Sequence, residues 1–221
     1  MNLLKKPSQH PRLRAVSSAI FGCCLVFATC ALSASFGLKL VQAQSAAPAD
    51  HAPSGWFMAG SKPANYQTGV DQAVVENGQS SAFLKSAVPT TDGFGTLMQT
   101  ISASEYAGKR VRLRAWVRSQ DVADWAGIWM RVDRGSTSVA FDNMQNRPIK
   151  GNQSWETCDV VLDVPQNATS ISFGILLSGA GEVWMSDLTF EIVGNEVPTT
   201  NLTPNPMTPP PNRPANLNFT E

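Results

Sequence analysis

Residues 109–133 read KRVRLRAWVRSQDVADWAGIWMRVD, with an apolar side chain at every second position near each end of the stretch. A period of two places successive side chains on opposite faces of an extended chain, whereas a helix repeats about every 3.6 residues. The sequence therefore predicts two half-buried β-strands, 109–118 and 125–133. Their inward sides hold Val111, Leu113, Ala115, Val117, Ala126, Ile128, Met130 and Val132.

The same alternation recurs along the chain. Residues 158–164, 169–177 and 182–193 repeat it, with Trp184 on the inward side of the last run, and Gly, Pro, Asn and Asp separate the runs. No segment has the pattern of a long amphipathic helix. These features predict an all-β protein, an antiparallel two-sheet β-sandwich (jelly roll) of about nine strands. Shorter candidate strands lie near 64–71, 81–87, 94–101 and 137–142.

The first 43 residues have the composition of an export signal. Residues 1–16 are basic and contain no acid, an apolar run follows from Ala15 to Leu38, and Val41-Gln42-Ala43 fits a signal-peptidase site. This order is typical of a secretory signal. We therefore expect a signal peptide at 1–43 and a periplasmic or secreted protein. The alternative is an uncleaved anchor in the inner membrane that leaves the protein facing outward, because about 20 apolar residues span a bilayer.

Charge and cysteine content narrow the possible partners. Five of the 17 basic residues and none of the 17 acidic residues precede Gln44, so a cleaved chain would carry 12 basic and 17 acidic residues. A net negative protein argues against nucleic acid, which is bound by basic surfaces. Three of the four cysteines lie in the export segment, which leaves Cys158 and no internal disulfide.

Composition also sets the expected domain boundaries. Prolines recur among Asn and Thr from Val197 onward, a composition that favours extended chain over a packed core. We expect a linker at 44–53, one β-sandwich domain at 54–194 and a Pro/Asn/Thr-rich tail at 195–221.

Four segments resemble one kind of bacterial module. They are GFGTLMQ at 93–99, WAGIWMRVD at 125–133, FDNMQNRPI at 141–149 and GILLSGAGEVW at 174–184. The chain is similar to the galactose-binding-like, carbohydrate-binding-module-like jelly rolls that are attached to helix-turn-helix transcriptional regulators and to some exported hydrolases. This resemblance implies the fold and no defined activity. A regulator's role would not fit a chain that carries an export signal in place of a DNA-binding domain.

The resemblance also suggests a hypothesis about the tail. Modules of this kind open with a strand similar to Asn-Leu-x-Phe-Glu shortly before a Gly-Trp pair. Gly55-Trp56 is present here without that strand, while residues 216–221 read NLNFTE. The tail would then fill an edge position in its own domain or in a neighbouring copy, which allows self-association. The alternative is a plain linker.

The residues that commonly carry catalysis are missing from the predicted domain. His10 and His51 both precede it, which removes Ser-His-Asp and Cys-His arrangements and the usual zinc ligand sets. Asp133 and Asp142 are the one carboxylate pair that suits glycoside hydrolysis, against the simpler interpretation of solvated turn residues. We therefore expect no enzymatic activity, no cofactor and no metal site.

The binding hypothesis rests on the polar sides of the two central strands. If these strands are neighbours, two indoles form a platform on which a sugar ring stacks, while Arg and Asp bind its hydroxyl groups. Loop residues of FDNMQNRPI lie beside it, although turn geometry alone can require them. Trp155, in the turn GNQSW, is expected to cover one end of the sandwich. The predicted ligand-binding residues are Trp116, Trp129, Arg112, Arg114, Arg131, Asp133, Asn143 and Arg147.

Two functions of different class follow from this platform. One is a non-catalytic module outside the cytoplasm that binds a glycan or another small ligand. The other is a structural or partner-binding domain whose tryptophan face docks a protein or a second copy. Charged residues beside the indoles favour the glycan, because stable protein interfaces lose charge at their centre.

Overall fold

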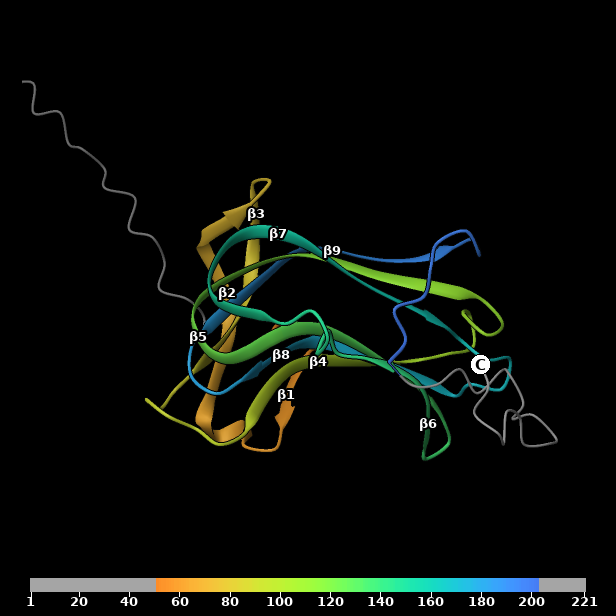
Figure 1. The fold of residues 1–221 in the computed structure, drawn as a ribbon, viewed down its shortest axis with the longest axis horizontal. Helices are drawn as coiled ribbons and strands as arrows, with labels where there is room; N and C mark the ends of the chain where they lie inside the picture. The colour runs from red at the N-terminus through yellow and green to blue at the C-terminus, as the bar shows by residue number, and fades with distance from the viewer. Residues whose placement is uncertain (1–50, 203–221) are drawn as a thin grey trace, which may run out of the picture. The chain divides into compact units, whose positions relative to one another are not determined.

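This computed structural model describes residues 51–202, which contain nine strands and one short 3₁₀ turn joined by loops (Figure 1). All strand pairs are antiparallel, so the predicted all-β sandwich is confirmed. Within these residues no helix is long and apolar enough to cross a membrane. The elements are β1 (Phe57–Gly60), the 3₁₀ turn (Pro63–Asn65), β2 (Tyr66–Glu76), β3 (Gln79–Ser86), β4 (Phe94–Ser102), β5 (Arg110–Arg134), β6 (Thr137–Asp142), β7 (Ile149–Asp163), β8 (Ser170–Ser178) and β9 (Glu182–Val193).

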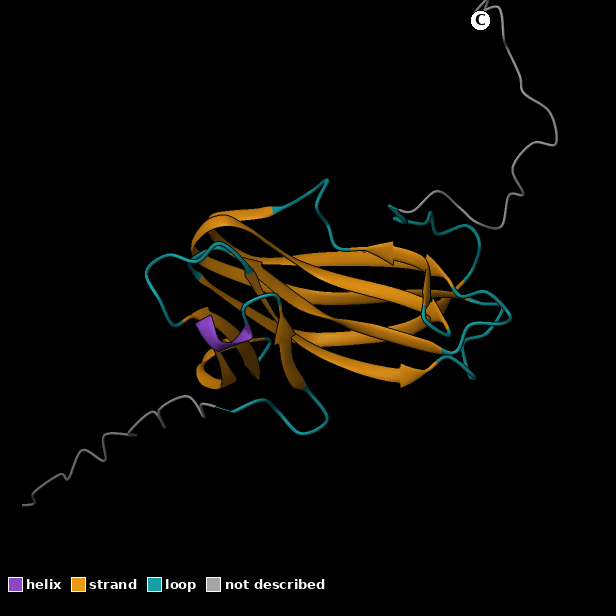
Figure 2. Ribbon diagram, turned by 90° about the horizontal axis from the view of Figure 1, so that it is seen from below, coloured by secondary structure: helices purple, strands orange, loops and turns teal. Residues whose placement is uncertain are grey.

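Strand β5 runs through both layers of the sandwich (Figure 1). Figure 2 shows the strands of the sandwich in a view turned by 90°. Its first half pairs with β7 and β9, which gives layer 1 the order β7-β5-β9-β3-β2. Its second half pairs with β8 and β6, which gives layer 2 the order β6-β5-β8-β4-β1. The two strands that the sequence predicted, 109–118 and 125–133, are therefore one strand of 25 residues.

A bend with bulges joins the two halves of β5 where the sequence separated two strands. The register with β7 shifts between Val117 and Ser119 and shifts again on each side of Val122. Asp121 has a φ of +52°, in the left-handed region that few non-glycine residues adopt. Bulges turn a strand without ending its hydrogen bonding, and this lets β5 pass from one layer into the other.

The bend also exchanges which side chains face the core. In layer 1 the odd-numbered residues from Val111 to Val117 are buried, and in layer 2 the even-numbered residues from Ala126 to Val132 are buried. Both sets belong to a single hydrophobic core between the layers. The alternate residues of the two halves therefore point to opposite outer faces of the sandwich.

The prediction that Trp184 faces the core is wrong, because a second bulge, in β9, changes which residues point inward. Asp187 has a φ of +49°, and the β5–β9 register shifts beside it. As a result Val183 and Met185 face the core, while Trp184 pairs with Arg118 on the outer side of layer 1. Trp184 is nevertheless buried, and its Nε1 donates to Asp71 Oδ2 at 3.2 Å.

Hydrogen bonding to the sandwich continues past residue 194, where the sequence analysis placed the start of the tail. The Thr200 amide donates to the Val161 carbonyl and the Leu202 amide donates to the Phe141 carbonyl, both at 2.9 Å. The predicted export segment at 1–43 and the predicted edge strand at 216–221 lie outside the described residues.

Candidate functional site

The predicted tryptophan platform does not form. Trp116 lies in the half of β5 that belongs to layer 1, and Trp129 lies in the half that belongs to layer 2. Both point away from the shared core, so they occupy opposite outer faces. Only 7% of Trp129 is exposed. The prediction was wrong because it treated one bent strand as two neighbouring strands.

The charged residues assigned to the platform are paired within the protein. Arg112 Nη2 lies 2.7 Å from Glu191 Oε1 on β9, and Arg114 makes two hydrogen bonds of 2.6 Å to Asp159 on β7. The hydrogen bond to Asp159 raises the pKa of Arg114. In layer 2, Arg131 lies 3.0 Å from Asp133 of the same strand. The first two ion pairs connect β5 to its neighbouring strands, and the third joins two residues of β5. These charged side chains therefore stabilise the sheets.

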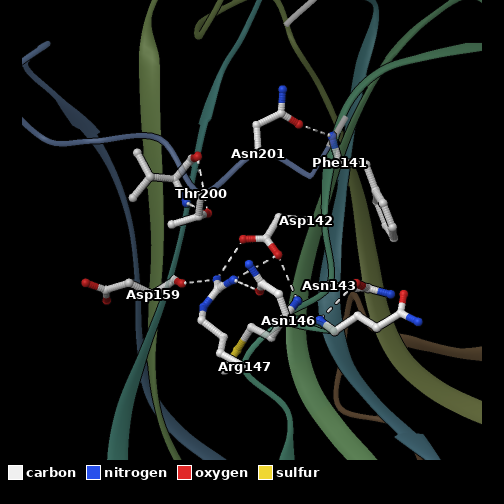
Figure 3. Close-up of polar contacts among 11 residues, drawn as sticks. Phe141, Asp142, Asn143, Asn146, Arg147, Asp159, Thr200 and Asn201 are labelled. Carbon is white, nitrogen blue, oxygen red and sulfur yellow. Dashed lines mark hydrogen bonds and ion pairs between the residues drawn. The ribbon is translucent and has the colours of Figure 1, made fainter. Parts of the chain in front are cut away.

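The FDNMQNRPI loop is organised around a buried carboxylate (Figure 3). Asp142 is fully buried, and Arg147 contacts both of its oxygens, with Nη2 to Oδ2 at 2.7 Å and Nη1 to Oδ1 at 3.2 Å. Asp142 also accepts the Met144 amide at 2.8 Å, and Arg147 donates to the Asp159 carbonyl at 2.7 Å. Asn143 accepts the Gln145 amide at 3.2 Å. The Asn143 contact lies within the loop, and the Arg147 contact holds the loop against β7.

The Asp133–Asp142 pair that was considered for glycoside hydrolysis is not brought together. Asp142 pairs with Met130, whose side chain is in the core, while Asp133 shares the outer side with Arg131. The two carboxylates therefore lie on opposite faces of the β5–β6 hairpin. Each is already bound to an arginine, so no shared reaction site exists between them.

A trough of about 550 Å³ lies where β5 and β7 bulge together at the end of layer 1. Between the Val117–Glu156 and Ser119–Gln153 pairs, β7 has one residue more than β5, so that Ser154 and Trp155 lie opposite Arg118. Gly151, with a φ of +63°, lies at the next register shift. The trough is lined by Arg118, Ser119, Gln120, Asp121, Asn152, Gln153, Ser154 and Trp155.

Internal hydrogen bonds fix the rim of the trough. The Asp121 amide donates to Asn152 Oδ1 at 2.9 Å, and Asn152 Nδ2 donates to Asp121 Oδ1 at 3.1 Å. Ser119 Oγ donates to the Gly151 carbonyl and accepts the Gln153 amide, both at 3.1 Å. These four bonds tie β5 to β7 across the bulges, so the side chains between them project from a braced backbone.

Several side chains of the trough make no hydrogen bond and no ion pair within the described residues. Among residues 51–202, no hydrogen bond or ion pair is made by the side chains of Arg118, Gln120, Gln153, Ser154 or Trp155. The Arg118 guanidinium lies 5.5 Å from the Trp184 ring centre, a cation–π contact. It also interacts electrostatically with Asp71, the carboxylate that accepts the Trp184 indole N–H, but its own N–H donors make no hydrogen bond or close ion pair within the described residues. Five other arginines differ from Arg118 because each forms an ion pair with a carboxylate. They are Arg110, Arg112, Arg114, Arg131 and Arg147.

This site was not predicted from the sequence, because Trp155 was expected only to cover an end of the sandwich and not to bind a ligand. The cluster of hydrogen-bonding side chains in KGNQSW was the available signal. It became interpretable only once the bulge placed this segment opposite Arg118.

Cys158 lines a separate pocket of about 400 Å³ between β7 and the FDNMQNRPI loop. Burial raises the pKa of the Cys158 thiol to about 11. At neutral pH the thiol is therefore protonated and a poor nucleophile. In the described part of the chain, no group of three His, Cys, Asp or Glu side chains is arranged to hold a metal ion.

Comparisons with known proteins support the fold and show one clear sequence relative. The "Uncharacterized HTH-type transcriptional regulator YbfP" of Bacillus subtilis (strain 168) is 44% identical over 170 residues, or 76% of this chain. The chain spans 57% of the length of that protein. This match is consistent with the motif resemblance, which was to jelly rolls attached to helix-turn-helix regulators. No family model matches the chain.

Two solved structures that are similar to this chain have low sequence identity to it. An apo cyclase from Fischerella sp. matches 72% of this chain and 94% of its own, with 16% identity and a TM-score of 0.50. The CBM22-1 xylan-binding domain of Xyn10C from Paenibacillus barcinonensis matches 65% of this chain and 89% of its own, with 14% identity and a TM-score of 0.47.

Proposed function

We propose that this chain is a non-catalytic glycan-binding module and that the trough is its binding site. One observation carries the proposal: a partly exposed indole stands among an unpaired guanidinium, two unpaired amides and a hydroxyl group. The C–H face of a sugar ring packs on an indole. Sugar hydroxyl groups both donate and accept, which suits the amides of Gln120 and Gln153 and the donors of Arg118.

Trp116 extends the same surface along β5. It lies two positions before Arg118 and is half-buried on the outer face of layer 1. It pairs with Thr157 of β7, two residues after Trp155. A saccharide longer than one ring would therefore meet a second indole. Of the residues of the predicted platform, Trp116 is the one that we retain for glycan binding.

We also propose that the module is not catalytic, because its candidate carboxylates are already bound to other side chains. Asp142 and Asp133 are each bound to an arginine, and Asp121 is bound to Asn152. Glycoside hydrolysis requires two carboxylates on opposite sides of one bond, about 5–10 Å apart in an open site. Neither the trough nor the β5–β6 hairpin offers that arrangement among the described residues.

Trp155→Ala and Arg118→Ala are each expected to weaken glycan binding about tenfold or more, because each removes a contact worth roughly 1.5–3 kcal/mol. The measurement is a glycan-array screen of the wild-type protein, followed by calorimetry of the best oligosaccharide with each variant. Arg112→Ala is the matched control, since Arg112 lies on the same face but is paired with Glu191. Binding that survives both trough variants would refute the assignment, and so would an array without any ligand.

We also propose that the module works outside the cytoplasm, on the strength of the basic and apolar order of residues 1–43. The protein isolated from its host is then expected to begin at Gln44. Intact-mass measurement of that protein checks this directly. Recovery of a chain that still begins with Met1 in the membrane fraction would instead establish an anchored protein.

A further inference from the structure

A second concave feature lies on the outer face of layer 2, opposite the face that carries the trough. It is a groove of about 380 Å³ that crosses all five strands of the layer. Each strand contributes at least one lining residue, among them Gly60 on β1, Met98 on β4, Leu176 on β8, Trp129 on β5 and Phe141 on β6. The outer face of an antiparallel sheet is usually polar, because it meets water. An apolar groove in that place is therefore unusual.

Trp129, on the central strand of the layer, lines the groove. Trp129 pairs with Gly174 of β8, and Gly174 pairs in turn with Met98 of β4. The indole reaches across β8 and donates from Nε1 to Thr96 Oγ1 on β4 at 2.8 Å. Thr96 also donates to the Ile175 carbonyl at 2.8 Å. Both polar groups of the floor are thus used internally, and what faces the groove is apolar.

Arg131 is the charged residue that lines the groove. It pairs directly with Phe141 across the β5–β6 hairpin, and its side chain is 44% exposed. Its Nε and Nη2 both contact a single oxygen of Asp133, at 3.0 Å. A guanidinium has five N–H donors, so this pair leaves the Nη1 edge able to donate to a bound molecule. The groove therefore offers donors at the Arg131 end and apolar contacts elsewhere.

We infer that this groove is a binding site for a small, largely apolar molecule that carries one acceptor oxygen, either a carboxylate or a carbonyl. The acceptor would lie at Arg131, and the apolar body would pack between Met98, Leu176 and Phe141 over the Trp129 ring. A volume of 380 Å³ lies within the roughly 300–1,000 Å³ of small-molecule pockets, which combine apolar walls with few polar groups. A sugar would find few partners for its hydroxyl groups here. This inference is therefore separate from the proposed glycan site.

Three probes distinguish the parts of this ligand. Indole-3-acetate carries a carboxylate, indole-3-acetamide carries a neutral carbonyl, and indole has the ring without the acceptor. With the full chain, we expect saturable binding of the first two and about tenfold weaker binding of indole, since one hydrogen bond to a charged donor is lost. Amide chemical shifts measured by NMR are expected to change near Arg131, Phe141 and Met98.

Arg131→Gln is expected to reduce binding of the acetate and the acetamide to the level of indole, whereas Phe141→Ala is expected to weaken all three probes. Arg112→Gln, an ion-paired arginine on the other layer, is the matched control and should change nothing. Trp155→Ala should leave these probes unaffected even if it abolishes glycan binding, which separates the two sites. Shifts that map elsewhere, or probe affinities unchanged in Arg131→Gln and Phe141→Ala, would overturn the inference.

Discussion

Asp142→Ala is expected to lower the free energy of unfolding by about 3–5 kcal/mol, the usual cost of removing one partner of a buried ion pair. Asp142 is fully buried, contacts two nitrogens of Arg147 and accepts the Met144 amide. The substitution leaves the Arg147 guanidinium, two-thirds buried, without its counter-charge. It also releases the loop that Arg147 attaches to β7 through the Asp159 carbonyl.

Urea unfolding followed by tryptophan fluorescence measures this change. Glu191→Ala is the control, because it removes the partner of Arg112 from a more exposed pair and should cost less than about 1 kcal/mol. Asp142→Asn keeps the size and one acceptor oxygen, so it should fall between the two. Equal losses for Asp142→Ala and Glu191→Ala would show that the buried pair does not organise the loop.

Gly174→Ala is expected to cost about 3 kcal/mol or more, at the upper end of the range for inserting a methyl group into a packed interior. A Cβ at this position would overlap the Leu97 carbonyl oxygen and would lie 2.9 Å from Met98 Cα. Both are backbone atoms of β4, so the clash cannot be relieved by rotating a side chain. The β4–β8 pairing would have to open at the centre of layer 2.

The control for this prediction is Gly135→Asn, at the β5–β6 turn. Gly135 has a φ of +58°, which asparagine tolerates, and a Cβ there would meet nothing within 4 Å. Thermal unfolding of the two variants and the wild-type protein should place Gly135→Asn near the wild type and Gly174→Ala far below it. A Gly174→Ala protein with wild-type stability would mean that β4 and β8 have room to separate.

The strand class was predictable from the sequence because alternation depends on local chain geometry alone. Val111 to Val117 and Ala126 to Val132 each show the period of two that the structure confirms. What the pattern does not encode is the bend at Asp121, which decides whether Trp116 and Trp129 share a face. The change from odd to even apolar positions was visible in the sequence, but it fits either a turn between strands or a bend within one.

The candidate site was harder to predict because it depends on pairing between distant residues. That Arg112 and Arg114 are neutralised follows from the register of β5 against β9 and β7. That Arg118 is left unpaired, beside Trp155, follows from one extra residue in β7. Neither fact is a property of composition or spacing. The same residue type therefore has a structural role at two positions and an unpaired guanidinium at a third.

The long strand β5 also constrains how this protein acquires its fold. Four strands pair with it, and all four, β6, β7, β8 and β9, come later in the chain. While residues 51–134 alone have been synthesised, β5 has no partner, and the apolar sides of both its halves remain in water. Topologies dominated by distant contacts fold slowly and expose apolar surface in the meantime. Because β9 lies between β5 and β3, we expect the core to close only after β9 has emerged, and we expect no shorter N-terminal fragment of the sandwich to fold by itself.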